Sequence, residues 1–152
     1  MSLRQRPFRL PFLVVAVGIV LASSIYQTAR AQSTGPARSA RDGVFSAAQV
    51  ARGKAQYIQN CVVCHGDNLG GDGGRVPELI GDQFLTNWGG GKTLDELFTR
   101  VQFRSPEDSP RSLKDSVYVD IIAFILRENE FPTGPSELKL EDMGTIVVPS
   151  RK

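Results

Sequence analysis

The short stretch NCVVCHG, at residues 60–66, constrains the fold of this chain more than any other part of its sequence. It contains both cysteines, Cys61 and Cys64, and the single histidine, His65, of 152 residues. The chain therefore places all of its thiolate and imidazole ligands within five consecutive positions. The spacing C-x-x-C-H is the attachment signature of a c-type haem. We expect a fold that can hold a flat and mostly apolar ring beside this segment.

The spacing suits such a ring for a simple geometric reason. Residues three apart on a helical turn share one face, so Cys61 and Cys64 can both present their sulfur atoms to the two vinyl groups of one porphyrin edge. His65 points in a different direction, from which its imidazole can reach the iron. We therefore expect one covalent haem c with its iron, bound by Cys61, Cys64 and His65, with His65 as the metal ligand.

Other interpretations of the two cysteines agree less well with the chain. A disulfide between Cys61 and Cys64 would close a very small loop and would restrain little of the unfolded chain. A thioredoxin-type dithiol sits on a βαβ framework, for which the sequence shows no pattern. A zinc site needs four ligands, and the sequence has no further cysteine or histidine to complete one.

Residues 1–31 have the pattern of a signal peptide for export. A basic stretch precedes the apolar run LPFLVVAVGIVLASSIY, and the small residues of ARA end the segment before Gln32. The alternative is a retained membrane anchor, although the apolar run is shorter than the roughly 20 residues that a spanning helix needs. Both interpretations place the folded part outside the cytoplasm. We expect a periplasmic protein, associated with the membrane only if this segment is retained.

The charge of the remaining chain excludes one class of partner. Four of the 18 basic residues lie in residues 1–31, which contain no acidic residue, so 14 basic and 16 acidic residues remain. A net charge of −2 without a basic stripe gives no basis for binding nucleic acid.

Periodicity and capping signals predict an all-α domain. Residues 32–44 are mostly polar and small and contain Gly and Pro, and we expect residues 32–45 to form a flexible lead-in. A first helix is predicted from about residue 47 into the cysteine motif, with Ser46 and Gln49 as a capping box. Residues 66–92 contain nine glycines and predict a long loop with a short helical turn near DQFLTNW.

Two further helices complete the predicted domain. Thr93 and Glu96 form a second capping box before an amphipathic helix of about ten residues, which Pro106 ends. A third helix is predicted from Ser112 to about residue 130, and residues 133–152 are expected to be a C-terminal tail. The expected fold is thus a small domain over residues 46–132, with three main helices and long loops wrapped around one haem.

These segments resemble the class I cytochromes c, in particular bacterial domains with a single haem. The resemblance covers about residues 46–132 and depends on the segments ARGKAQYIQNCVVCHG, VPELIG and YVDIIAFIL. It implies that Gly53 and Tyr57 on the first helix pack against Phe124 on the last. It also implies that the backbone carbonyl of Pro77 accepts a hydrogen bond from Nδ1–H of His65, which fixes the tautomer of the imidazole.

The chain departs from this family at one position that matters for function. Electron-transfer members use a methionine sulfur as the second axial ligand, just before a proline, and the corresponding residue here is Ser105 before Pro106. Met143 lies beyond the third helix. The sixth ligand is therefore Ser105, Met143, a lysine such as Lys92 or Lys114, water or none, and a hydroxyl is a poor donor to ferrous iron.

Two functions follow from these observations. The first is an exported carrier, not itself an enzyme, that passes single electrons between periplasmic redox proteins or to a dehydrogenase or oxidase. The second is a five-coordinate haem protein that binds a small ligand, such as a diatomic gas or peroxide, because the axial methionine is replaced by Ser105.

Overall fold

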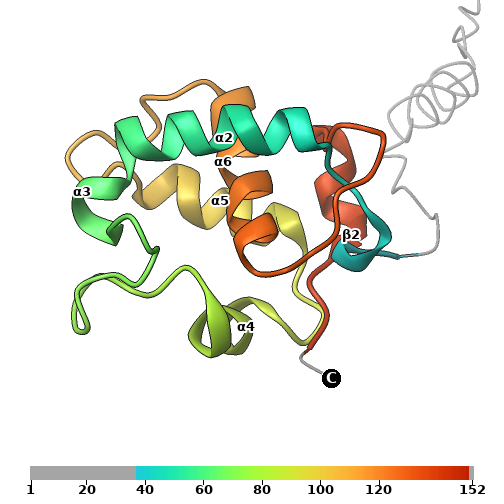
Figure 1. Cartoon of the computed structure of the whole chain (residues 1–152), viewed down its shortest axis with the longest axis horizontal. Coiled ribbons are helices and arrows are strands. Elements are labelled where there is room, and N and C mark those ends of the chain that lie inside the picture. The colour runs from blue at the N-terminus through green and yellow to red at the C-terminus, as the bar shows by residue number, and fades with distance from the viewer. Residues whose placement is uncertain (1–36, 151–152) are drawn as a thin grey trace, which may run out of the picture. The chain divides into compact units, whose positions relative to one another are not determined.

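The computed structural model describes residues 37–150, so the signal peptide predicted over residues 1–31 lies outside the described residues. The described part is mainly helical, as the sequence predicts (Figure 1). In chain order its elements are β1 (Arg38–Ser39), η1 (Ala40–Asp42), α2 (Ala47–Asn60), α3 (Val62–His65), α4 (Gly81–Trp88), α5 (Leu94–Arg104), α6 (Asp115–Glu128), η2 (Leu140–Thr145) and β2 (Ile146–Val147). None of the described helices is both long enough and apolar enough to cross a bilayer.

The crossing of α2 and α6 is the most extensive contact between helices (Figure 1). Gly53 lets the two backbones approach so closely that a Cβ atom at this position would lie 1.9 Å from the carbonyl oxygen of Asp120. One turn further along α2, the ring of Tyr57 packs against Phe124, with the ring centroids 5.3 Å apart. The predicted packing of Gly53, Tyr57 and Phe124 is confirmed.

Helix α5 begins as its sequence predicts. The hydroxyl of Thr93 accepts a hydrogen bond from the backbone N–H of Glu96, and the Glu96 carboxylate accepts one from the backbone N–H of Thr93. This capping box satisfies two amide donors at the helix start. The apolar stripe of α5 is buried, and Phe98 meets Tyr118 of α6 edge to face at 6.2 Å between centroids.

The segment before α2 differs from the prediction of a flexible lead-in over residues 32–45. Residues 38–45 form β1, η1 and a buried stretch in which Ala40 and Phe45 are fully enclosed. β1 pairs in parallel with β2 near the C-terminus, where Arg38 faces Ile146. The physical reason is tertiary, because the partners of these residues lie about a hundred positions away and leave no local pattern.

A C-terminal tail was predicted over residues 133–152, and its described part, residues 133–150, contributes to the same core. Met143, Ile146 and Val148 are each 0 % exposed. The side chain of Gln49 holds this segment to α2, since its amide donates to the carbonyl of Leu138 and accepts from the Leu138 N–H, at 3.0 and 2.8 Å. Gln49 therefore does not close the capping box predicted for it, although its backbone N–H donates to the Ser46 hydroxyl as expected.

Candidate functional site

The two cysteines lie where α2 turns into the short helix α3. Cys61 follows the last residue of α2 and caps both helices, and Cys64 lies within α3. Its carbonyl accepts hydrogen bonds from the backbone N–H groups of both Cys64 and His65, at 3.2 and 3.0 Å. All three side chains therefore start from one helical turn, as their spacing predicts. Both cysteines are free, with Cys61 half-buried and Cys64 exposed.

The environment of Cys61 does not favour redox cycling. Burial raises the pKa of the Cys61 thiol to about 11, and the neighbouring Cys64 adds to this effect. A dithiol oxidoreductase depends on a thiol whose pKa is lowered, so that the thiolate is present at neutral pH. The raised pKa counts against the thioredoxin-like interpretation of Cys61 and Cys64.

The loop that follows the motif holds the imidazole of His65 through its Nδ1 atom. Its Nδ1 lies 3.1 Å from the carbonyl oxygen of Pro77. A carbonyl can only accept, so Nδ1 carries the proton and Nε2 keeps its lone pair. Burial lowers the pKa of His65, while the hydrogen bond to Pro77 and the charge of Asp72 act in the opposite direction. The contact between His65 and Pro77 is the one that the resemblance implies.

The loop that positions Pro77 depends on Asp72, which sequence analysis did not single out. The carboxylate of Asp72 accepts hydrogen bonds from the backbone N–H groups of Gly74 and Val76, at 2.9 and 2.8 Å. These bonds lower the pKa of Asp72. Gly71 passes so close to Val76 that a Cβ atom would lie 2.2 Å from its carbonyl oxygen. The aspartate followed by two glycines was the available signal for such a turn.

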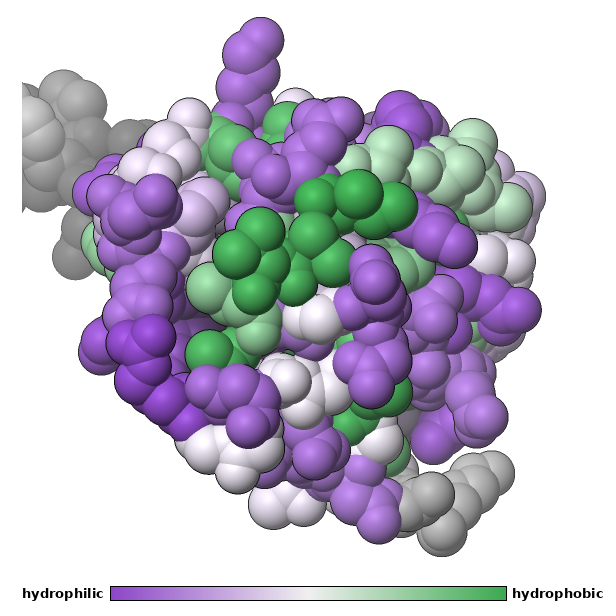
Figure 2. All heavy atoms as spheres, turned by 60° about the vertical axis from the view of Figure 1, so that its left-hand side comes forward, coloured by the Kyte–Doolittle hydropathy of each residue, from purple (hydrophilic) through white to green (hydrophobic). Residues whose placement is uncertain are grey.

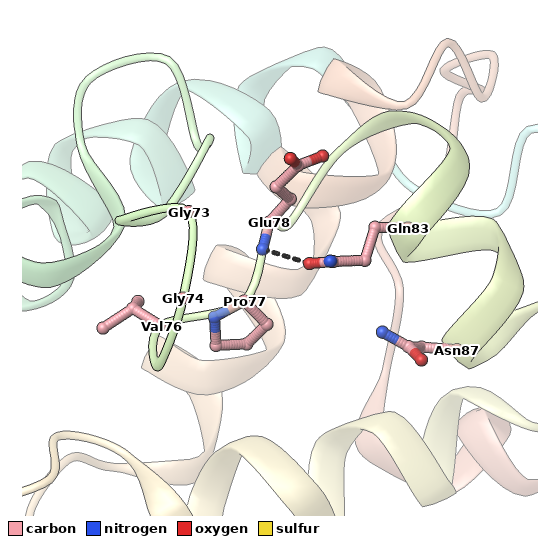
Figure 3. A pocket seen from close by; sticks show the side chains of 7 residues that line it. All are labelled: Gly73, Gly74, Val76, Pro77, Glu78, Gln83 and Asn87. Carbon is pink, nitrogen blue, oxygen red and sulfur yellow. Dashed lines mark hydrogen bonds between the residues drawn. The ribbon is translucent and has the colours of Figure 1, made fainter.

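A hollow beside this loop does not include the motif. It has a volume of about 220 Å³ and is lined by loop residues around Pro77 and by Gln83 and Asn87 of α4 (Figure 3). Gln83 accepts a hydrogen bond from the backbone N–H of Glu78 at 2.6 Å and so holds the loop to α4. Because neither the cysteines nor His65 lines this hollow, we assign it no role in binding the ring.

The candidate sixth ligands are held in different ways. Ser105 ends α5, and its carbonyl accepts a hydrogen bond from the hydroxyl of Tyr118 at 2.9 Å. Met143 lies in η2 and is enclosed by protein atoms of the hydrophobic core. Lys92 donates its ammonium to the carbonyl of Asn87 and lies 5.5 Å from the centre of the Trp88 ring.

The donor set fits a covalently attached haem better than a bare metal ion. Two free thiols and a neutral imidazole share one turn, and the imidazole is oriented through its Nδ1. Within residues 37–150, no three histidine, cysteine or acidic side chains come together as a chelating group. Thioether bonds to a ring and one nitrogen ligand need no such cluster.

Comparisons with known proteins agree with this chemistry. The family model described as Cytochrome c matches residues 50–127, which is just over half of the chain. The matched part runs from α2 through the motif to α6. No curated protein and no solved structure matches the chain.

Proposed function

The chain belongs to the cytochrome c family and is thus a haem-binding electron-transfer protein, and we propose that it carries single electrons between periplasmic partners through one covalent haem. The observation that carries this proposal is the imidazole of His65 anchored at Nδ1 by Pro77, one turn from two free thiols. A bound haem supplies reversible one-electron chemistry at its iron. The chain supplies attachment and orientation.

Each residue of the site has one task in this proposal. Cys61 and Cys64 would hold the ring relative to α3 through thioethers, each made by adding a thiol S–H across the double bond of one vinyl group. His65 directs Nε2 to the iron, while Pro77 keeps the imidazole in the tautomer that ligation requires. The task proposed for these residues is to hold and orient the haem, which is the task of an electron carrier.

We propose that partners dock where the motif meets solvent. Val63 lies between the two cysteines and is 94 % exposed. Figure 2 brings forward the side of the molecule on which α3 lies, and apolar side chains gather on that face. A short path from the attached edge to solvent allows a periplasmic redox protein, a dehydrogenase or an oxidase to exchange electrons there. The periplasmic location rests on the signal-like residues 1–31.

The proposal is tested by making the full chain in a host that can attach haem c. We expect a coloured protein whose mass exceeds that of the processed polypeptide by one haem, and a redox titration with a single one-electron step. A variant with both Cys61→Ala and Cys64→Ala should lose the covalent haem. A colourless wild-type protein at the bare polypeptide mass would rule the proposal out.

A second function is favoured by one observation. The position at which the family places methionine is Ser105, and the sulfur of Met143 is enclosed in the core. We infer that His65 would be the one side chain of the described residues to hold the iron, which could then take up a small molecule. Rapid binding of carbon monoxide to the reduced protein is the expected result. A low-spin spectrum that the gas does not alter would exclude this second function.

A further inference from the structure

A single phenol joins the two ends of the segment that follows α5. Tyr118 on α6 is 1 % exposed, and its hydroxyl donates to the carbonyl of Ser105 at 2.9 Å. The same oxygen accepts a longer hydrogen bond from the backbone N–H of Leu113, at 3.5 Å. The first and last residues of the segment 105–113 are therefore tied to one atom.

The position of this hydroxyl is set by the core and not by the segment. The ring of Tyr118 is buried between α5 and α6, where it meets Phe98 at an interplanar angle of 86°. Its backbone belongs to the first turns of α6. Buried aromatic rings keep one orientation because close packing leaves no room for another. The packing of the core therefore sets the position of the Tyr118 hydroxyl, and this hydroxyl in turn holds the carbonyl of Ser105.

The other contacts of the segment come from backbone groups or from side chains that are not buried. The backbone N–H of Ser105 donates to the carbonyl of Val101 at 2.9 Å. The backbone N–H of Arg111 donates to the carbonyl of Gln102 at 3.0 Å, and the Gln102 amide donates to Asp115 at 2.7 Å. Glu107 pairs with Arg75 at 3.0 Å, but both side chains are about three-quarters exposed, and such pairs contribute little. No other buried side chain in the described residues hydrogen-bonds to Ser105 or Leu113.

We propose that Tyr118 is a positioning residue, whose hydroxyl determines where residue 105 stands on the side of the haem opposite His65. The inference rests on the proposed function, because it takes residue 105 as the position that faces the iron. Losing the hydroxyl leaves the ring in place, removes the hydrogen bond at the carbonyl of Ser105 and leaves Ser105 held by the bond from its own backbone N–H to the carbonyl of Val101, at 2.9 Å. Access to the iron then changes without any change in the groups that attach the haem.

The first test compares Tyr118→Phe with a matched control in the haem-loaded protein. Tyr57 is also 1 % exposed, and its hydroxyl donates to a backbone carbonyl, that of Gly66, at 2.7 Å. Tyr57→Phe removes a similar bond from another loop. Amide hydrogen exchange of residues 105–113 should speed up about tenfold in Tyr118→Phe and not in Tyr57→Phe, as expected for one lost buried hydrogen bond. Equal rates in wild type and Tyr118→Phe would overturn the proposal, and so would equal acceleration in both variants.

The second test uses a spectroscopic signature that a merely structural role would not change. Ser105→Met should introduce a sulfur ligand, seen as the charge-transfer band of methionine bound to ferric haem. Combined with Tyr118→Phe, this band should fade at a lower temperature than in Ser105→Met alone, while Tyr57→Phe should leave it in place. A coloured Ser105→Met protein without the band would place residue 105 away from the iron and overturn the proposal. A failure of the proposed function is different, because the protein would then carry no haem.

Discussion

The contact between Gly53 and α6 allows a prediction whose sign is not obvious from sequence. Replacing a glycine by alanine inside a helix normally stabilises the helix by about 1 kcal/mol. At Gly53, however, the added Cβ would lie 1.9 Å from the carbonyl oxygen and 2.6 Å from the carbonyl carbon of Asp120. Both obstacles are backbone atoms of α6, so no rotation of a side chain can relieve the clash.

The expected loss of stability follows from how much too close the added Cβ atom would lie to α6. Ordinary contact begins at 3.4 Å, so the gap of 1.9 Å is too short by about 1.5 Å. The helices α2 and α6 must separate by much of this distance, which loosens the packing of Tyr57 on Phe124. Overpacking of a core costs about 1–3 kcal/mol, and a backbone obstacle belongs at or above the upper end. After the helix gain, we expect Gly53→Ala to lower the free energy of unfolding by about 2–4 kcal/mol.

Chemical denaturation of the haem-loaded protein measures this change, with Gly144→Ala as the matched control. A Cβ atom at Gly144 would meet nothing within 4 Å, so this variant should stay within about 0.5 kcal/mol of wild type. A Gly53→Ala protein that is as stable as wild type would refute the argument that the two backbones touch. So would an equal loss in both variants.

Substitutions at three further positions test other parts of the structure. Met143→Ala should lower the free energy of unfolding by about 2–5 kcal/mol, as for other buried methionines. It should leave the haem spectrum unchanged, and a changed spectrum would mean that the sulfur is a ligand. Arg52→Ala should cost about 1 kcal/mol by removing its hydrogen bonds to α6 and the tail. Arg52 holds the pKa of Glu137 below 4.5. The part of the Arg52 contribution that comes from Glu137 is therefore present above pH 4.5 and is lost as the pH falls below it. The denaturation curves of wild type and variant should converge in acid. Asp72→Ala should accelerate exchange of the Val76 amide, whereas Asp72→Asn, which keeps an acceptor oxygen, should restore protection.

Much of the helical framework could be predicted because its signals are local. Ser46 and Thr93 begin helices as their hydroxyls allow, and the short helix near DQFLTNW is α4. The third helix shows the limit of such signals. Its predicted start at Ser112 is wrong by a few residues, because the structure caps α6 at Lys114 without a side-chain hydrogen bond.

The candidate site also has features that local sequence predicts and features that it does not. The spacing of Cys61, Cys64 and His65 predicts one turn that presents all three side chains, and the structure has that turn. The bond from His65 to Pro77 was expected only from the resemblance, because nothing local relates two residues twelve positions apart. The part played by Asp72 in shaping this loop was missed, since an aspartate in a glycine-rich stretch is common in any turn.

The sequence by itself determined the motif, the helices with strong caps and the family, because these depend on residues that are neighbours along the chain. Only the tertiary structure decided that residues 38–45 and the C-terminal tail belong to the core, with Gln49 joined to Leu138. It alone also placed the hydroxyl of Tyr118 at Ser105. Such contacts join segments that are not neighbours along the chain, and their partners are set by how the helices pack, so no periodicity or spacing predicts them.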